Sequence, residues 1–340
     1  MKVRRAGHSS RHRATVLAAA LLWTAPLFAV VPFNVGDVFA GVGRGKFNHF
    51  SPTGVLLETL DDTQAVGSGE DATTGMCFDP AGNMFGTNLD KSTMSKFSNN
   101  GTLLAATFGS FSGPESCLII NGNTMFVSEV FGGNILKVSL PAGTQLASYS
   151  TSRSDWIDLA ADQCTMFYSD EGPSIHRFNV CTNTALANFT NAGPAFYALR
   201  ILPNGDVLAA AGGSVKRFNS AGTEITPAYT ASGESTFFAL NLDPDGTHFW
   251  SGGIGTGKIY KFNLTPVGAP VLTFDSQIAA AQGTILAGLA VFGETTVSQA
   301  TPTPTPGTPV QVVVPTLSFP MLGVLALALI AAAFLAIRRA

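Results

Sequence analysis

The sequence predicts an all-β fold, a six-bladed β-propeller of four-stranded blades over residues 30–295. Three observations predict it: a 41-residue repeat, four short strand-like segments in each repeat without helical periodicity, and a C-terminal segment that completes the first repeat. The composition agrees, because 36 Gly and 25 Phe with only 12% charged residues are typical of a chain with many turns and an apolar core.

The repeat is anchored by short β-like triplets whose third residues lie 41 positions apart. These third residues are Phe85, Phe126, Phe167, Leu208 and Phe249. An apolar run precedes each anchor, usually with a turn such as Asp79-Pro80-Ala81-Gly82 between them. Each anchor is followed by a basic residue and an apolar residue, as in Lys96-Phe97 and Arg217-Phe218, and then by a second turn and a last short run. Each unit therefore contains the four strands of a propeller blade.

The number of blades follows from the two ends of the repeat region. Five full units begin near residues 74, 114, 155, 195 and 236. Upstream, Gly36-Asp37-Val38-Phe39 begins a blade that lacks its innermost strand. Downstream, Gly288–Phe292 is similar to the innermost strand Gly75–Phe78, and no further blade follows it. The C-terminal strand is therefore predicted to complete the N-terminal blade, which gives six blades and a ring without free edges.

Residues 1–29 are predicted to be a signal peptide. Five basic residues and no acid occupy the first thirteen positions, and an apolar run follows over residues 14–31. Cleavage fits after Ala29 or after Ala40, and we favour Ala29 because the later site would remove a strand that the ring needs. A retained N-terminal membrane helix is the alternative.

The C-terminal part is predicted to tether the propeller. Residues 296–316 form a Thr/Pro-rich linker whose run Thr301–Pro309 favours polyproline II, with threonines that either carry O-linked sugar or remain unmodified. Residues 317–340 contain nineteen uncharged residues, Phe319–Ile337, followed by Arg338-Arg339. This length can cross a bilayer, and the arginines set the cytoplasmic side. We expect an exported protein at the cell envelope or surface, with one membrane span and the propeller outside the cytoplasm.

Two resemblances extend this prediction. The motif Val314-Pro315-Thr316-Leu317-Ser318, followed by an apolar helix and a basic end, resembles the IPTL-CTERM and PEP-CTERM sorting tails of bacteria. That resemblance implies anchoring and processing by an exosortase-like enzyme. The tail departs from the pattern at Phe319-Pro320, where the IPTL form has an acidic residue and Trp, so cleavage and simple anchoring both stay open. The repeat over residues 35–294 resembles NHL-type and virginiamycin-B-lyase-like bacterial propellers, and this resemblance implies the fold rather than an activity.

Four cysteines in an exported chain suggest disulfides. Cys164 and Cys181 flank the two strands of one hairpin and are predicted to face each other and form a bridge. Cys77 and Cys117 lie on innermost strands of neighbouring blades. A bridge between them is one alternative, but two separate buried thiols are favoured.

Propellers bind ligands where the innermost strands begin, eleven or twelve residues before each anchor. The candidate ligand-binding residues there are Glu115, Asp155, Trp156, Phe196, Tyr197, Phe237 and Phe238. Two acids and five aromatic rings suit a sugar or an apolar or peptide-like partner. The alternative is that the aromatic rings pack between blades.

No catalytic motif or cofactor site is predicted. The regucalcin and gluconolactonase enzymes, which share this architecture, hold a divalent cation with acidic and Asn side chains, but here only Glu115 and Asp155 fall at comparable positions. His49, His176 and His248 lie off the innermost strands and are predicted to be structural or surface residues. The net charge of −3 argues against a nucleic-acid partner.

The sequence therefore favours a non-enzymatic surface module with a protein or glycan partner. A metal-dependent lactonase- or lyase-like enzyme that uses Glu115 and Asp155 is the alternative, and a purely structural role in the envelope is a third.

Overall fold

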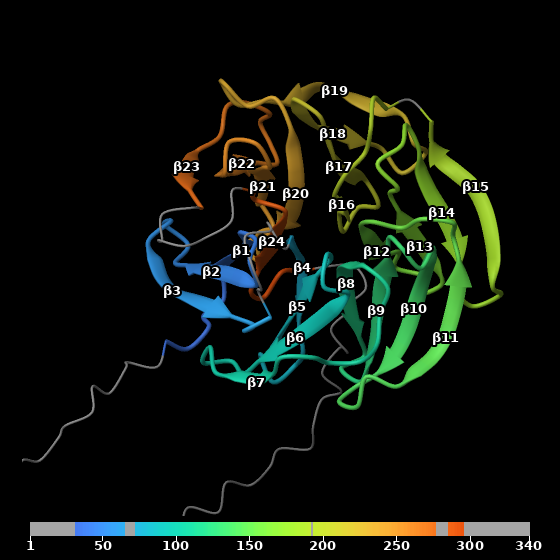
Figure 1. Ribbon diagram of the computed structural model, residues 1–340. Coiled ribbons are helices and arrows are strands. Elements are labelled where there is room, and N and C mark those ends of the chain that lie inside the picture. Colours follow the sequence, from blue (N-terminus) through green and yellow to red (C-terminus); the bar gives the residue numbers. More distant parts are fainter. Residues whose placement is uncertain (1–30, 65–71, 192, 277–284, 296–340) are drawn as a thin grey trace, which may run out of the picture. The chain divides into compact units, whose positions relative to one another are not determined.

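The computed structural model describes residues 31–64, 72–191, 193–276 and 285–295. These residues form 24 strands in six four-stranded antiparallel sheets, and no helix occurs among them (Figure 1). They belong to one compact unit. The predicted all-β propeller with six four-stranded blades is confirmed.

The blades are numbered here along the chain, with strands given from innermost to outermost. Blade 1 contains β24 (Gly288–Val291), β1 (Val38–Gly41), β2 (Lys46–Phe50) and β3 (Leu56–Asp61); blade 2 contains β4 (Thr73–Phe78), β5 (Met84–Asn88), β6 (Thr93–Phe97) and β7 (Leu103–Ala105). Blade 3 contains β8 (Pro114–Ile120), β9 (Thr124–Glu129), β10 (Asn134–Ser139) and β11 (Gln145–Ser150); blade 4 contains β12 (Ile157–Leu159), β13 (Thr165–Tyr168), β14 (Ile175–Asn179) and β15 (Thr184–Thr190). Blade 5 contains β16 (Leu199–Ile201), β17 (Val207–Ala211), β18 (Ser214–Phe218) and β19 (Glu224–Tyr229); blade 6 contains β20 (Phe237–Leu242), β21 (His248–Gly253), β22 (Lys258–Asn263) and β23 (Leu272–Asp275).

The ring is closed by strands from the two ends of the repeat region. β24 pairs antiparallel with β1, and the register places Val291 beside Val38 and Gly288 beside Gly41. Figure 1 shows the two strands together, β1 in blue and β24 in orange. The innermost strands contact one another in ring order, from β24 through β4, β8, β12, β16 and β20 back to β24. The prediction that the C-terminal strand completes the first blade is therefore confirmed.

The antiparallel order gives the propeller two distinct faces. We call the end at which the innermost strands begin the mouth face, and the opposite end, where the first turn of each blade lies, the turn face. The backbone N–H of Gly36 donates to the carbonyl of Phe292 at 2.9 Å, next to the start of β1 and the end of β24. Both ends of the described chain therefore lie at the turn face.

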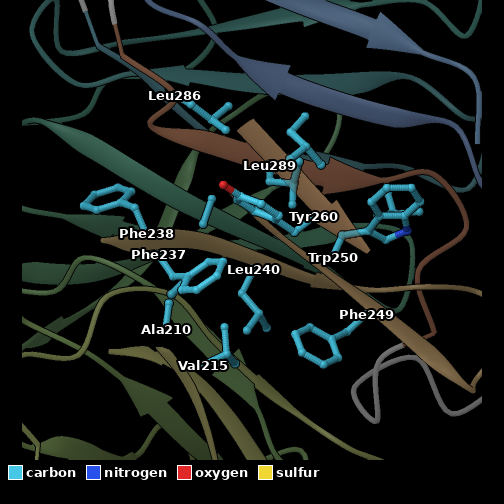
Figure 2. Packing of buried hydrophobic residues seen from close by; sticks show 14 of the residues in the cluster. Ala210, Val215, Phe237, Phe238, Leu240, Phe249, Trp250, Tyr260, Leu286 and Leu289 are labelled. Carbon is cyan, nitrogen blue, oxygen red and sulfur yellow. The ribbon is translucent and has the colours of Figure 1, made fainter. Parts of the chain in front are cut away.

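Aromatic side chains fill the space within and between blades. One packed cluster joins blades 1, 5 and 6 with Trp156 of blade 4, and it includes Phe237, Phe249, Trp250 and Tyr260 (Figure 2). Burial of rings of this size contributes a large share of the hydrophobic stabilisation.

The repeated basic residue of the third strand packs over an aromatic ring of the second strand. Lys96 lies 4.9 Å from the centroid of the Phe85 ring, and Lys261 lies 5.0 Å from that of Trp250. This cation–π contact gives the basic residue of the repeat a structural role.

Both cysteine pairs form disulfides and use all four cysteines. The predicted Cys164–Cys181 bridge is confirmed, although the register pairs Thr165 with Asn179, so that Cys181 lies one residue past the position directly across from Cys164. The expectation that Cys77 and Cys117 stay separate thiols was wrong, because their Cα atoms lie 5.7 Å apart, within bonding range. Gly75 explains the close approach of these strands, since a Cβ at this position would lie 2.6 Å from the carbonyl oxygen of Glu115.

In the described part of the chain, no helix is long and apolar enough to cross a membrane. The predicted signal peptide (residues 1–29), the linker (296–316) and the anchor (317–340) lie outside the described residues.

Candidate functional site

One position at the start of the innermost strands differs in chemistry from blade to blade. It recurs every 41 residues through blades 2 to 6, and the strand register gives its counterpart in blade 1. We call the side chains at this position the mouth residues: Thr74, Glu115, Trp156, Tyr197, Phe238 and Ala287. Blades 4, 5 and 6 thus contribute three consecutive aromatic rings, and blade 3 contributes a carboxyl group.

The preceding position, by contrast, places two of the predicted aromatic residues in the core. Phe196 is fully buried with its ring centroid 5.7 Å from that of Phe218. Phe237 is fully buried against Tyr260, with ring centroids 5.4 Å apart (Figure 2). Trp156 and Phe238 are buried as well, so Tyr197 is the one predicted aromatic residue that is partly exposed.

The three aromatic mouth residues belong to one packed cluster. The rings of Tyr197 and Phe238 lie 5.1 Å apart in a tilted arrangement. Trp156 is 2% exposed and Phe238 is 7% exposed, whereas Tyr197 is partly exposed. Tyr197 is therefore the aromatic mouth residue that solvent reaches most readily.

Glu115 and Asp155 form a buried carboxyl pair at the mouth. Both side chains are 2% exposed. Arg153 Nε donates to both oxygens of Asp155, at 2.8 and 3.1 Å, and the same guanidinium lies 2.6 Å from Glu171. One basic group therefore faces three acids.

The environment of this pair favours a bound proton. Burial raises the pKa of Asp155 to about 6, although hydrogen bonds from Glu115 and Arg153 oppose the shift. Burial, together with the adjacent Asp155 carboxylate, raises the pKa of Glu115 well above its ordinary value. Burial therefore favours the neutral form of both carboxyl groups, more strongly for Glu115 because the Asp155 carboxylate lies beside it.

Two polar atoms at adjacent mouth positions have no hydrogen-bond partner among the described residues. They are Oε2 of Glu115 and Nε1 of Trp156, both in side chains that are almost fully buried. Buried polar atoms are nearly always hydrogen-bonded in proteins, to the chain itself, to water or to a ligand. Both atoms are themselves buried, so they are unsatisfied polar groups inside the mouth.

A second polar network lies further along the innermost strands, and the sequence analysis did not identify it. Glu294, three residues after β24, accepts from Arg200 Nε at 2.8 Å and from Asn241 Nδ2 at 2.7 Å. Asp158 on β12 accepts from the backbone N–H of Ile201 at 2.8 Å. Charged residues inside otherwise apolar innermost strands, Asp158 and Arg200, were the signal that could have indicated it. The network joins blades 1, 4, 5 and 6, and its role is to hold these blades together.

His49 is a structural residue of the repeat. It is fully buried, and its ring nitrogens lie 2.9 Å from Asp37 and 3.1 Å from Glu58. His49 lies on the third strand of blade 1 and pairs with Asp37, which directly precedes the second strand. Arg217 and Asp206 occupy the same positions in blade 5 and lie 2.6 Å apart. Within the described ranges, no group of three or more His, Cys, Asp and Glu residues could hold a metal ion.

Fold and site together define a disulfide-bonded six-bladed β-propeller with a buried carboxyl pair beside three aromatic rings. A scan of protein-family models finds no match to this chain, and a search of curated proteins finds none either. The resemblance to NHL-type propellers and to sorting tails stays a prediction from the sequence.

Proposed function

We propose that this chain is an exported, membrane-tethered binding module, whose propeller binds a partner at its mouth face without catalysing a reaction. The arrangement of Glu115, Asp155 and the aromatic mouth residues carries the proposal. The residues differ from blade to blade, as a site for one asymmetric ligand requires. The two disulfides are consistent with a location outside the cytoplasm.

The position of the chain ends also supports this function. The described chain enters and leaves the propeller at the turn face. Residue 295, the last described residue of the propeller, therefore lies at the end of the ring opposite to the mouth residues.

The alternative is a lactonase- or lyase-like enzyme that holds a divalent cation with Glu115 and Asp155. The Nε–H of Arg153 is shared between both oxygens of Asp155, and burial raises the pKa of Glu115, which favours its neutral form. Hard cations are bound by several ionised or carbonyl oxygens, and this pair supplies few of them.

The test is the divalent-metal content of the full-length protein, purified in a non-ionic detergent, together with its thermal unfolding with and without a chelator. We expect less than one metal ion per ten chains, no change in melting temperature on chelation, and no turnover of lactones. One bound cation per chain and a melting temperature that falls on chelation would contradict the binding-module proposal and support the enzyme.

A further inference from the structure

The outermost strands of the six blades are unequally protected against pairing with a further strand. Such a strand leaves one row of backbone N–H and C=O groups without a neighbour, and proteins protect these edges with charged side chains, proline or short length. β7 has three residues and β23 has four. β3 carries Glu58 and Asp61, and β19 carries Glu224 and Pro227. β11 and β15 have none of these features.

β15 is the least protected of the six edges. It is the longest outermost strand, with seven residues, and residues 184–188 are all exposed. No charged residue occurs between Arg177 and Arg200. Among the described residues, no strand lies beside the outer side of β15, which forms the outer edge of blade 4 in Figure 1. The register irregularity between β14 and β15 does not set this edge apart, because blades 1, 2, 3 and 5 have one at the same place.

β15 is also held firmly to its own blade. Cys181, three residues before the strand, is bonded to Cys164, which directly precedes β13. In the middle of the strand, Arg177 Nε donates to the carbonyl of Ala187 at 2.9 Å. The edge is therefore ordered before any partner arrives, and this order lowers the entropic cost of association.

The absence of charge on β15 makes a second copy of the same strand a suitable partner. Antiparallel pairing about a two-fold axis brings identical surfaces together. Like charges that face each other across two strands are destabilising, and β15 has none to bring together. Leu186, which is 38% exposed, offers an apolar side chain from each copy. Because this pairing uses the edge of both copies, it stops at a dimer.

We infer that β15 pairs antiparallel with β15 of a second copy, which joins the four-stranded sheets of the two blades 4 into one continuous sheet. The inference goes beyond the proposed function, since it uses the outer edge of the ring and leaves the mouth face unchanged. The contact between two seven-residue strands is small, so the dimer is weak, with a Kd on the order of 10 µM.

The test is the oligomeric state of the full-length protein in non-ionic detergent, measured by sedimentation velocity at concentrations on both sides of this Kd. We expect a monomer–dimer equilibrium in the parent protein. Leu186→Lys should weaken it at least about tenfold, because each copy then brings a positive charge to the shared edge.

Ile225→Lys is the matched control. Leu186 and Ile225 face the equivalent arginines Arg177 and Arg217 of their third strands, and they are 38% and 37% exposed. Since β19 already carries a charge and a proline, Ile225→Lys should dimerise like the parent protein. Melting curves equal to that of the parent show that both variants are folded.

Hydrogen exchange of the parent protein at low and high concentration tests the same contact without a substitution. We expect the amides of β15 to exchange more slowly at high concentration, whereas those of β19 stay unchanged. A parent protein that stays monomeric well above the expected Kd, or that assembles into species larger than a dimer, would overturn the inference. So would a dimer that Leu186→Lys leaves intact, or one that Leu146→Lys on β11 dissociates instead.

Discussion

Asp158 is a carboxyl without exposed surface, and its titration makes a pH-dependent contribution to stability. Burial raises its pKa from 3.8 to about 6, although Arg200 and the N–H of Ile201 oppose the shift. Because the folded pKa lies above the unfolded one, the folded state binds the proton more tightly. This contribution is therefore fully present below about pH 4 and is lost as pH rises through about 6.

We expect Asp158→Asn to make the decline in unfolding free energy between pH 4 and 6.5 shallower, by up to about 1.4 kcal/mol per pH unit. Urea unfolding at several pH values measures this slope of unfolding free energy against pH. Asp245→Asn is the control. The pKa of Asp245 is lowered to about 2, because hydrogen bonds from Thr247 and His248 outweigh its partial burial. Removal of this carboxyl therefore changes the pH dependence of the unfolding free energy below pH 4. A slope for Asp158→Asn equal to that of the parent protein would refute the assignment.

Gly288 shows how closely neighbouring innermost strands approach. A Cβ at this position would overlap the backbone carbonyl oxygen of Thr74 in blade 2, and backbone cannot move aside as a flexible side chain can. We expect Gly288→Ala to lower the unfolding free energy by at least about 2 kcal/mol. Gly268→Ala is the control, because nothing lies within 4 Å of its added Cβ. Similar melting temperatures for the two variants would show that β24 tolerates the side chain.

At the level of elements, the two disulfides constrain different parts of the ring. Cys77–Cys117 joins innermost strands of neighbouring blades over a sequence separation of 40, whereas Cys164–Cys181 closes a hairpin region over a separation of 17. Cross-linking a longer loop removes more conformational entropy from the unfolded chain. We therefore expect Cys77→Ala/Cys117→Ala to lower the free energy of unfolding by about 4 kcal/mol and Cys164→Ala/Cys181→Ala by about 3 kcal/mol. Urea midpoints of the double variants measure the difference. Thiol titration of the parent protein under denaturing conditions should detect no free cysteine, and two free thiols would contradict the Cys77–Cys117 bridge.

The repeat explains which elements the sequence could predict. A 41-residue period determines strand order and blade number because each blade has the same four strands. It does not determine how far apart neighbouring blades lie, and the close contact that permits the Cys77–Cys117 bridge depends on Gly75. The period also aligns Phe196 with Phe237 and Tyr197 with Phe238 without showing that Tyr197 alone of the four is partly exposed. That distinction depends on the alternation of side chains along each strand, which the irregular start of the innermost strands obscures.

In the whole molecule, stability depends on closure of the ring between the first and last parts of the chain. β24 supplies the innermost strand of blade 1, and Glu294 follows it. The carboxylate of Glu294 accepts from Arg200 in blade 5 and from Asn241 and the Leu242 N–H in blade 6, at 2.8, 2.7 and 2.6 Å. One side chain beyond the last strand therefore ties blade 1 to both blades that precede it in the ring.

Glu294→Ala should weaken this closure. It leaves the Arg200 guanidinium, whose side chain is 8% exposed, without its direct ion-pair partner, and removal of one partner from a buried pair costs about 3 kcal/mol or more. Glu224→Ala is the matched control, because the Lys216–Glu224 pair lies nearer the surface and contributes at most about 1 kcal/mol. Urea unfolding measures the loss, and hydrogen exchange locates it. We expect the amides of β24 and β1 to exchange faster in Glu294→Ala while those of β9 and β10 in blade 3 keep their protection, because local opening begins where the ring was closed. Equal losses in the two variants, or uniform exchange over all blades, would show that the ring is held by strand pairing alone and that Glu294 has no special part in closing it.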